Sequence, residues 1–320
     1  MKKILQTATK YIKHFIKRLI QHLLIKLNHI HPPGFQGHSL YKVGNLFLKG
    51  LMQGFVTERA ASVAFSFFTA LFPLLLFSFT LIPYIPIENF QDDLLNFFHE
   101  IIPPQIWDVM DETVTYIITR KSGNLLSISV VLSLYFGTNG INSLFTAFRQ
   151  TYHRFTNASN WLKNRLYSLI ILTLIFVLLS ISVVVLGMGK YVLNIFRQEA
   201  LISGFLQWLF NVARLAIAIF TVMIAVATFY FFGSSRPHKF RIFTPGTITS
   251  TALIALTTMG FNYYITNFSR YNILYGSLGT ILILTFYLYV NAVFILIGFE
   301  INTSIRAAAV RGRLREKEHG

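Results

Sequence analysis

The 320-residue sequence contains no cysteine and few charged residues. Without cysteine the chain can form no disulfide, thiolate nucleophile or iron–sulfur cluster, and most structural zinc sites are excluded as well. Charged residues make up 12% of the chain, whereas roughly 25% is usual for a soluble domain. A soluble fold with so few charges would expose large apolar patches, so the composition indicates a membrane protein.

The polar residues also lack the groupings on which hydrolases and nucleotide-binding enzymes depend. Seven of the twelve acidic residues lie in one predicted loop, and the nine histidines show no metal-ligand spacing. The sequence contains no G-x-S-x-G and no P-loop motif. We therefore predict no enzymatic activity, no metal and no cofactor.

Hydrophobic residues make up 54% of the chain and gather in long blocks. Blocks of about 20 residues match the length that an α-helix needs to cross a hydrocarbon core of about 30 Å. We expect an all-α polytopic membrane protein with a basic N-terminal region at 1–60, a membrane domain at 61–302 and a tail at 303–320. The predicted spans are residues 62–84, 124–148, 166–187, 205–232, 243–267 and 274–302.

The net charge of +16 is unevenly distributed between the segments that connect these spans. Alternate segments, beginning with residues 1–60, hold 22 basic residues, and the other segments hold 5. The positive-inside rule places the basic set, including both termini, in the cytoplasm. We interpret the charge as a topology signal and predict no nucleic-acid partner.

Two segments outside the spans have amphipathic patterns. Residues 1–30 repeat apolar residues at helical spacing with lysines on the other faces, which predicts a helix lying on the anionic headgroups of membrane lipids. A polybasic retention signal is the alternative. The acidic segment 88–120 predicts two short helices separated by Pro103-Pro104.

Arg214 lies about nine residues into the predicted fourth span. A charge near the centre of a span costs about 2.5–3.5 kcal/mol on insertion scales, so it calls for a reason. The guanidinium could bind an anionic headgroup or a substrate phosphate in a cavity. Alternatively, it could extend toward the membrane surface or pair with backbone carbonyls for structural reasons.

The predicted second span contains Gly137, Asn139, Gly140 and Asn142 within six residues. Two glycines and two amides so close together could break the helix near the midplane and build a substrate site. The competing interpretation is close helix packing through small residues and interhelical hydrogen bonds.

Glu300 is the one acidic residue within a predicted span, near its cytoplasmic end. A buried carboxylate needs a partner, and Arg59 or Arg149 at the same side of the membrane could form a structural ion pair with it. A proton-coupling role is the alternative.

The segment Ser269–Asn302 contains a pattern of fixed residues, Y-N-x-x-Y-G-S-L-G followed by G-x-E-x-N. Its members are Tyr271, Asn272, Tyr275, Gly276, Ser277, Leu278, Gly279, Gly298, Glu300 and Asn302. The segment resembles the C-terminal signature of the YihY/BrkB family of bacterial inner-membrane proteins, and residues 58–77 and 136–153 resemble the first two spans of that family. The resemblance covers residues 45–305 and implies six helices in a bacterial inner membrane. The ribonuclease, virulence and transport labels that the family has carried do not follow from this pattern.

Our leading hypothesis for function is a transporter or flippase of an amphipathic or anionic substrate, such as a lipid. It depends on one arginine within a span, the polar segment of the second span and amphipathic segments on both sides of the membrane. The alternative is a non-transporting membrane scaffold or envelope assembly factor, whose polar residues would all pair internally. The sequence leaves the oligomeric state open.

Overall fold

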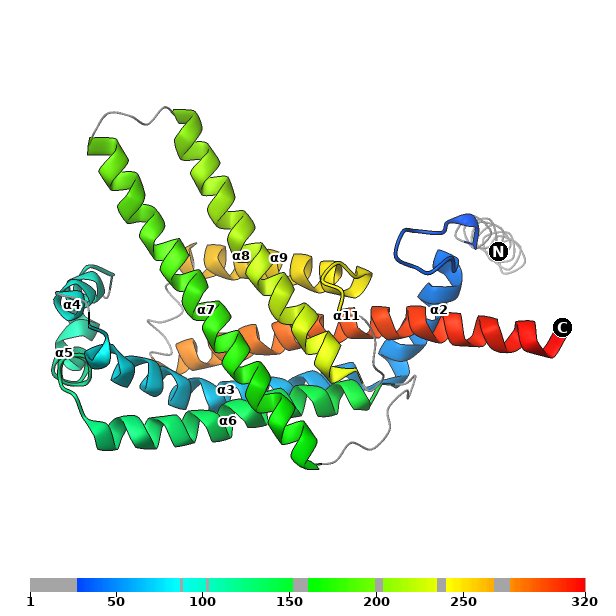
Figure 1. Ribbon diagram of the computed structural model, residues 1–320, viewed down its shortest axis with the longest axis horizontal. Helices are drawn as coiled ribbons and strands as arrows, with labels where there is room; N and C mark the ends of the chain where they lie inside the picture. The colour runs from blue at the N-terminus through cyan, green and yellow to red at the C-terminus, as the bar shows by residue number, and fades with distance from the viewer. Residues whose placement is uncertain are drawn as a thin grey trace, which may run out of the picture.

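The computed structural model describes residues 28–86, 89–101, 104–151, 161–198, 204–234, 240–267 and 277–319, and the regular elements in these ranges are all helices. The all-α prediction is therefore confirmed. The elements, labelled in Figure 1, are α2 (Leu40–Gln53), α3 (Val56–Leu81), η1 (Ile82–Tyr84), α4 (Phe90–Ile101), α5 (Pro104–Thr119), α6 (Gly123–Arg149), α7 (Trp161–Gln198), α8 (Gly204–Gly233), α9 (Pro245–Asn267) and α11 (Ser277–His319). Residues 1–27 of the expected N-terminal helix lie outside the described residues.

Five helices within the described ranges are long and apolar enough to cross a bilayer. They cover Val56–Tyr84, Gly123–Arg149, Trp161–Ser182, Trp208–Gly233 and Ile281–Gly312. Helix α9, the remaining expected span, is not among them. Hydroxyl residues lower its hydropathy, and the hydroxyls of Thr249, Thr257 and Thr258 each donate to the carbonyl four residues earlier. Because these hydroxyls are satisfied inside the helix, α9 can still lie in a membrane, and its crossing stays a prediction.

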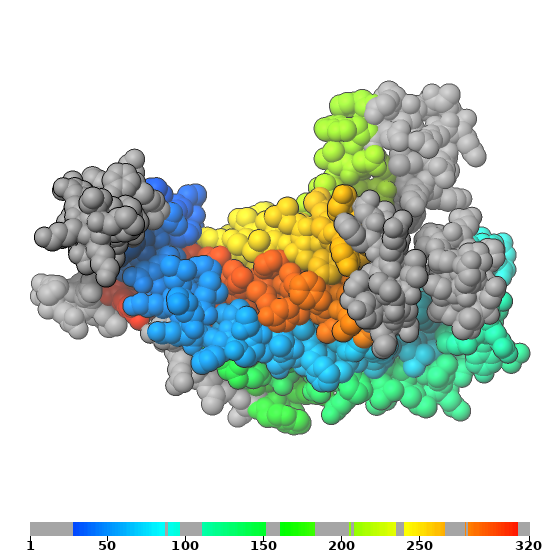
Figure 2. All heavy atoms as spheres, turned by 180° about the vertical axis from the view of Figure 1, so that it is seen from behind, coloured from blue at the N-terminus to red at the C-terminus, as the bar shows by residue number. Residues whose placement is uncertain are grey.

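Helices α3, α6, α9 and α11 form the main layer of the bundle. The most extensive contact is between α3 and α6, and α11 packs on α3, α9 and α2. Figure 2 shows α9 and α11 side by side, with α3 next to α11. The two short acidic helices, α4 and α5, are present as predicted and lie at the end opposite to α2 and the C-terminal end of α11 (Figure 1).

Helices α7 and α8 form a pair that crosses this layer obliquely and leaves it toward residues 198 and 204 (Figure 1). Burial along α8 follows the same division. Its second half is buried at Thr221, Met223, Val226, Ala227, Thr228, Phe229 and Tyr230. Its first half exposes Phe205, Trp208, Leu209, Val212 and Leu215. An apolar and exposed surface of this kind is suited to contact with lipid chains rather than water.

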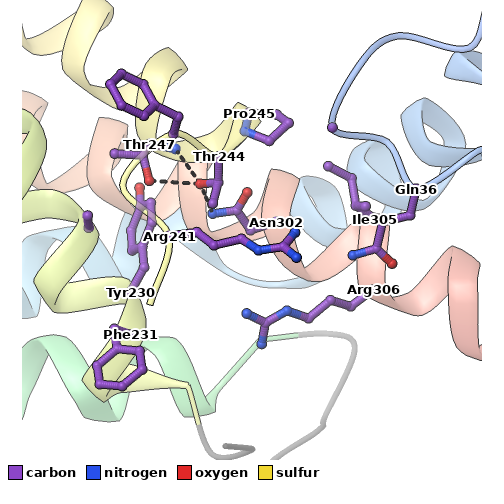
Figure 3. Close-up of a pocket in the computed structure, with 13 residues that line it drawn as sticks. Gln36, Tyr230, Phe231, Arg241, Thr244, Pro245, Thr247, Asn302, Ile305 and Arg306 are labelled. Carbon is purple, nitrogen blue, oxygen red and sulfur yellow. Dashed lines mark hydrogen bonds between the residues drawn. The ribbon is translucent and has the colours of Figure 1, made fainter. Parts of the chain in front are cut away.

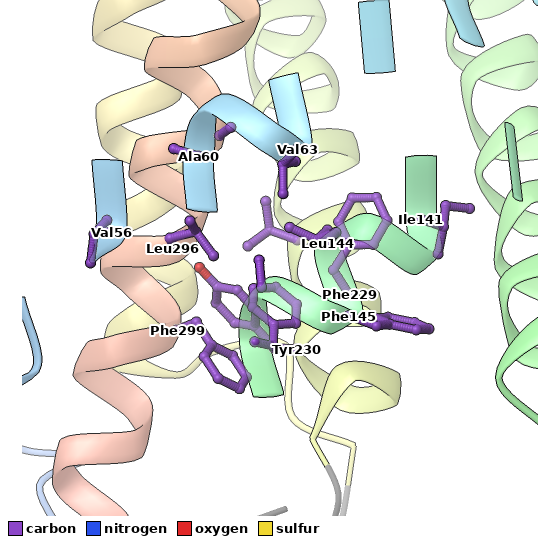
Figure 4. Close-up of a cluster of buried hydrophobic side chains, with 14 of the residues drawn as sticks. Val56, Ala60, Val63, Ile141, Leu144, Phe145, Phe229, Tyr230, Leu296 and Phe299 are labelled. Carbon is purple, nitrogen blue, oxygen red and sulfur yellow. The ribbon is translucent and has the colours of Figure 1, made fainter. Parts of the chain in front are cut away.

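Aromatic side chains join α6, α8 and α11 in the hydrophobic core (Figure 4). The rings of Phe148 and Phe299 stack with centroids 4.0 Å apart, and the Tyr230 ring lies 5.8 Å from each of them. Aromatic pairs of this kind contribute about 0.5–1.5 kcal/mol beyond their buried area. The end of α8 is thus fixed against α6 and α11, although its first half is not.

The approach of α9 to α11 depends on two glycines. A Cβ added to Gly298 would collide with the Ser250 hydroxyl, the Gly246 carbonyl and the Tyr230 hydroxyl. A Cβ added to Gly246 would collide with the Gly298 carbonyl and the Asn302 side chain. Small residues let two helix backbones approach closely in a membrane, where apolar burial gives no preference between protein and lipid.

We therefore expect Gly298→Ala to lower the stability of the purified protein by about 1–3 kcal/mol, the usual cost of forcing extra volume into a packed contact. The measurement is the midpoint of thermal unfolding in detergent, followed by tryptophan fluorescence. Gly260→Ala in α9 is the matched control, because an added Cβ there meets no atom within 4 Å. Equal midpoints for the two variants would contradict the packing role of Gly298.

Candidate functional site

A buried ion pair joins α3 to α11. Arg59 Nη2 lies 2.8 Å from Glu300 Oε1, and the two side chains are 4% and 0% exposed. Arg59 Nη1 also donates to the Ala147 carbonyl at 2.7 Å, and the Thr151 hydroxyl donates to Glu300 Oε2 at 2.8 Å. These contacts bring together α3, the end of α6 and α11, so one charged pair orders three helices. The Arg59 Nε is buried without a hydrogen-bond partner.

Arg149, the other arginine considered for Glu300, has a different contact. Its Nη2 donates to the Asn164 Oδ1 of α7 at 2.5 Å. The structure thus places Arg59 on Glu300, whereas Arg149 links α6 to α7. We call the end of the bundle that contains Arg59, Arg149, Arg241 and Arg306 the basic end.

The G-x-E-x-N pattern is explained by the two faces of α11. Gly298 and Asn302 are four residues apart and therefore lie on one face of the helix, which packs on α9. Asn302 Oδ1 accepts from the Gly246 N–H at 3.0 Å, and its Nδ2 donates to the Thr244 hydroxyl at 3.0 Å. Asn302 therefore caps the start of α9. Glu300 lies on another face of α11, toward α3 and α6.

The start of α9 borders a cavity of about 270 Å³ at the basic end (Figure 3). Its walls come from the end of α8, the residues leading into α9, α11 and the loop before α2. They are Gly34, Gln36, Ala227, Tyr230, Phe231, Arg241, Phe243, Thr244, Pro245, Thr247, Asn302, Ile305 and Arg306. The lining thus contains two arginines and, among the described residues, no carboxylate.

The two arginines enter the cavity from different elements. Arg306 extends from α11 and donates from Nη1 to the Ser234 hydroxyl at 2.6 Å. Arg241 precedes α9, is exposed and reaches the same space from the opposite side (Figure 3). The N-terminal end of α9 adds the partial positive charge of a helix dipole. Two guanidinium groups and the Gln36 amide can together hold a phosphate-like or carboxylate anion. The Gly246 and Thr247 N–H groups and the Asn302 amide are already engaged at the start of α9, so the helix contributes through its dipole alone.

The polar network behind the cavity holds Tyr230 in place. The Tyr230 hydroxyl lies 2.7 Å from Ser250 Oγ and 2.7 Å from the Ile295 carbonyl. These contacts join α8, α9 and α11 beneath the lining residues. The walls of the cavity are therefore built on packed helices rather than on loops alone, which keeps the positions of its polar groups defined.

The sequence-based choice of Arg214 as a substrate-binding residue does not match this cavity. Arg214 lies in the first half of α8, away from the residues that line the cavity. Its Nε is buried without a hydrogen-bond partner, and the side chain is half-buried. Its role as a substrate ligand remains a hypothesis.

The hypothesis of a broken second span is wrong, because α6 continues without interruption from Gly123 to Arg149. An added Cβ at Gly137 would lie 2.8 Å from the Leu172 side chain of α7, so this glycine packs α6 on α7. Gly140 faces Phe67 of α3.

One of the two amides in this stretch has a partner on another helix. Asn139 Oδ1 accepts from Arg165 Nη1 at 2.8 Å, and Asn142 is half-buried. Small residues and one interhelical hydrogen bond thus serve packing at this position, as the competing interpretation held.

Part of the C-terminal signature falls outside the described residues, namely Tyr271, Asn272, Tyr275 and Gly276. Ser277 begins α11, and Gly279 is buried. Arg241 and Arg306 were missed as site residues, since both counted only as topology charges in the sequence. A signal was available for Arg306, because it lies four residues after Asn302 and hence on the same face of the helix.

No group of three or more His, Cys, Asp or Glu residues that could hold a metal ion occurs in the described parts of the chain.

The long apolar helices, their exposed apolar surfaces and a polar cavity at one end define a polytopic α-helical membrane protein. A sequence profile of the family Virulence factor BrkB matches residues 47–319, and the chain belongs to this family.

Similar proteins carry names of two kinds. A ribonuclease-like protein, YfkH of Bacillus subtilis, is 25% identical over 268 residues, which cover 80% of this chain and 94% of YfkH. A UPF0761 membrane protein of Coxiella burnetii is 24% identical over 77% of this chain and 87% of its own. A UPF0761 membrane protein of Haemophilus influenzae is 21% identical over 83% and 96%. No solved structure matches the chain.

The Arg59–Glu300 pair leads to a stability prediction. We expect Arg59→Met to lower the free energy of unfolding by about 3–5 kcal/mol, because it leaves Glu300 as an uncompensated buried charge. The double variant Arg59→Met/Glu300→Gln removes both charges and should recover most of the loss. Unfolding by sodium dodecyl sulfate in mixed micelles measures both quantities. Additive losses in the double variant would show that the two residues do not stabilise each other.

Proposed function

We propose that this protein is an inner-membrane transporter or flippase for an anionic amphipathic substrate, with the Arg241–Arg306 cavity as its cytoplasmic binding site. Family membership supports the membrane location. The positive-inside rule supports a cytoplasmic position for the basic end and both termini.

The observation that carries the proposal is a cavity with two arginines from separate elements and no carboxylate among its described lining residues. Positive charges that converge without a neighbouring acid attract an anion, and the effect is stronger in a partly enclosed site than in open water. Guanidinium groups also bind phosphate or carboxylate through two parallel hydrogen bonds, which gives selectivity for such headgroups.

A second feature that supports the proposal is the arrangement of α8. Its end contributes Ala227, Tyr230 and Phe231 to the cavity, whereas its first half diverges from the main layer together with α7. Movement of α7 and the first half of α8 relative to the main layer would change access to the cavity, while the end of α8 stays packed on Phe148 and Phe299. Such movement is the usual means by which transporters expose one site alternately to two sides.

In this proposal Glu300 has a structural role. Its two carboxylate oxygens are engaged by Arg59 and Thr151, and it is fully buried. A proton-coupling carboxylate must gain and lose a proton during the cycle, whereas loss of the negative charge here would leave Arg59 without its counter-ion.

The second candidate is a non-transporting scaffold or assembly factor. The observation that favours it is the buried pairing of Arg59 with Glu300. A scaffold has no need for two arginines that face a cavity, so the transporter is preferred.

Reconstitution into proteoliposomes with headgroup-labelled phosphatidylglycerol tests the proposed function. We expect the wild-type chain to accelerate exchange of the label between the leaflets, as followed by quenching from outside. Arg241→Gln and Arg306→Gln should each slow the exchange about tenfold or more, since a hydrogen bond to a charged group contributes about 1.5–3 kcal/mol.

Lys163→Gln is the matched control, because it removes one exposed positive charge near the basic end from a residue that does not line the cavity. Its exchange rate should equal that of the wild type. Exchange no faster than in protein-free liposomes would count against a flippase. Equal slowing by all three variants would show that general surface charge, rather than the cavity, is responsible.

A further inference from the structure

An apolar groove of about 590 Å³ adjoins the arginine cavity. The two hollows share Gly34, Phe243 and Pro245 in their walls, so the groove continues the cavity along the outside of the bundle. Its other lining residues are Pro33, Phe35, Leu40, Val43, Gly44, Phe47, Ile248, Thr249 and Ile301. Within the described parts of the chain, the lining of the groove contains no charged side chain, in contrast to the cavity that it joins.

The walls of the groove come from α2 on one side and the start of α9 on the other. On α2, Leu40, Val43 and Phe47 recur at spacings of three and four and therefore lie on one face. On α9, Ile248 is 52% exposed, and Phe243 just before the helix is 69% exposed. Figure 2 shows the start of α9 next to α2 on this face of the molecule. Large apolar side chains are thus left accessible along a channel that begins at two arginines.

The surface of α2 indicates at which depth of the membrane the groove opens. The helix exposes Leu48 and Met52, at 58% and 84%, again at helical spacing, and Phe55 just beyond its end is 68% exposed. It also carries Lys42 and Lys49. An amphipathic helix with exposed apolar residues and lysines lies at a membrane interface, with the apolar residues in the acyl boundary and the lysines at anionic headgroups. The groove beside α2 therefore opens at the depth where headgroups meet acyl chains.

We infer that the cavity and the groove form one binding site for an anionic phospholipid of the membrane leaflet at the basic end. The headgroup phosphate lies between Arg241 and Arg306, and an acyl chain lies along the groove between α2 and α9. The inference deepens the proposed function, because it assigns a substrate class to the same cavity. It is a statement about binding, however, and it holds whether or not the bound lipid is moved across the membrane.

The chemistry of both parts is needed for this assignment. An inorganic phosphate or a soluble anion would use the arginines alone and gain nothing from Val43, Phe47 and Ile248. A zwitterionic lipid such as phosphatidylcholine would use the groove, but the two guanidinium groups would repel the choline cation attached to its phosphate. Each methylene buried in an apolar groove raises affinity about fourfold, so a chain of even a few carbons dominates the binding of an amphiphile.

Gly44 allows the groove to be filled without disturbing the fold. It lies in α2 and lines the groove, and a Cβ added there meets no atom within 4 Å. Gly44→Phe therefore places a ring in the path of the acyl chain. The matched control is Gly260→Phe, since Gly260 is also a helical glycine with open space at its Cβ and lies far along α9 from the groove.

The test is native mass spectrometry of the purified full chain in detergent, titrated with palmitoyl-oleoyl phosphatidylglycerol or with the phosphatidylcholine of the same chains. We expect the wild type to bind the phosphatidylglycerol at least about tenfold more tightly, the effect of one strong charge-assisted contact. Gly44→Phe should weaken that binding by about tenfold or more, and Gly260→Phe should not change it. An excess of inorganic phosphate should compete only weakly.

A second groove variant distinguishes a loss of lipid binding from a defect in folding. Ile248→Ser exchanges an exposed apolar wall residue for a polar one and should weaken phosphatidylglycerol binding several-fold at an unchanged unfolding midpoint. Full displacement by inorganic phosphate would overturn the inference, because the arginines would then act without the groove. Equal binding by the wild type and both groove variants would also overturn it.

The outcomes separate this inference from the proposed function. Phosphatidylglycerol binding that requires Arg241, Arg306 and an open groove, but without exchange between leaflets, would support the lipid site and count against the flippase. Exchange of lipid between the leaflets that requires both arginines but is unchanged by Gly44→Phe would support the flippase and count against the acyl-chain groove. In that case the transported anion has no chain in the groove.

Discussion

The Arg59–Glu300 ion pair is the contact on which the arrangement of this bundle depends. It joins residues that are 241 positions apart in the chain, and both side chains are almost completely buried. A charge in such surroundings is tolerated only with a partner of opposite sign and further hydrogen bonds. Ala147 and Thr151 supply these from the end of α6 and just beyond it. Any sliding of α11 past α3 would separate the charges, so the pair fixes the register of the first and last membrane-length helices.

That register decides where the other polar groups of α11 lie. Gly298 and Asn302 face α9, where the glycine allows close approach and the amide caps the helix start. Arg306, one helical turn further, then reaches the end of α8 through Ser234 and borders the cavity. The single helix α11 thus carries Glu300 of the ion pair, the residues that contact α9, and Arg306 of the cavity. Gly298, Glu300 and Asn302 of the family signature thus assemble α3, α9 and α11. The positive lining of the cavity depends on Arg241 and Arg306, which the signature does not include.

The errors of the sequence-based predictions have physical causes. Glycines and amides at 137–142 can break a helix or let helices approach, and the local sequence is the same in both cases. The outcome depends on Leu172 and Phe67, which come from other helices. Arg214 drew attention because charges are costly within a span, yet it lies in the first half of α8, which does not contribute to the cavity. Arg241 and Arg306 lie outside the spans expected from the sequence, where a charge costs little, so hydropathy gave no reason to single them out.

The sequence alone determined the helical class, the two acidic helices and the short list of partners for Glu300. These properties follow from hydropathy, proline positions and charge, all of which act over a few residues. Only the tertiary structure decided which arginine meets Glu300, that α6 is continuous, and that Arg241 and Arg306 border one cavity beside an apolar groove. These features depend on how helices that are distant in sequence cross one another. The packing of facing side chains sets where those helices meet, and no local sequence pattern records that packing.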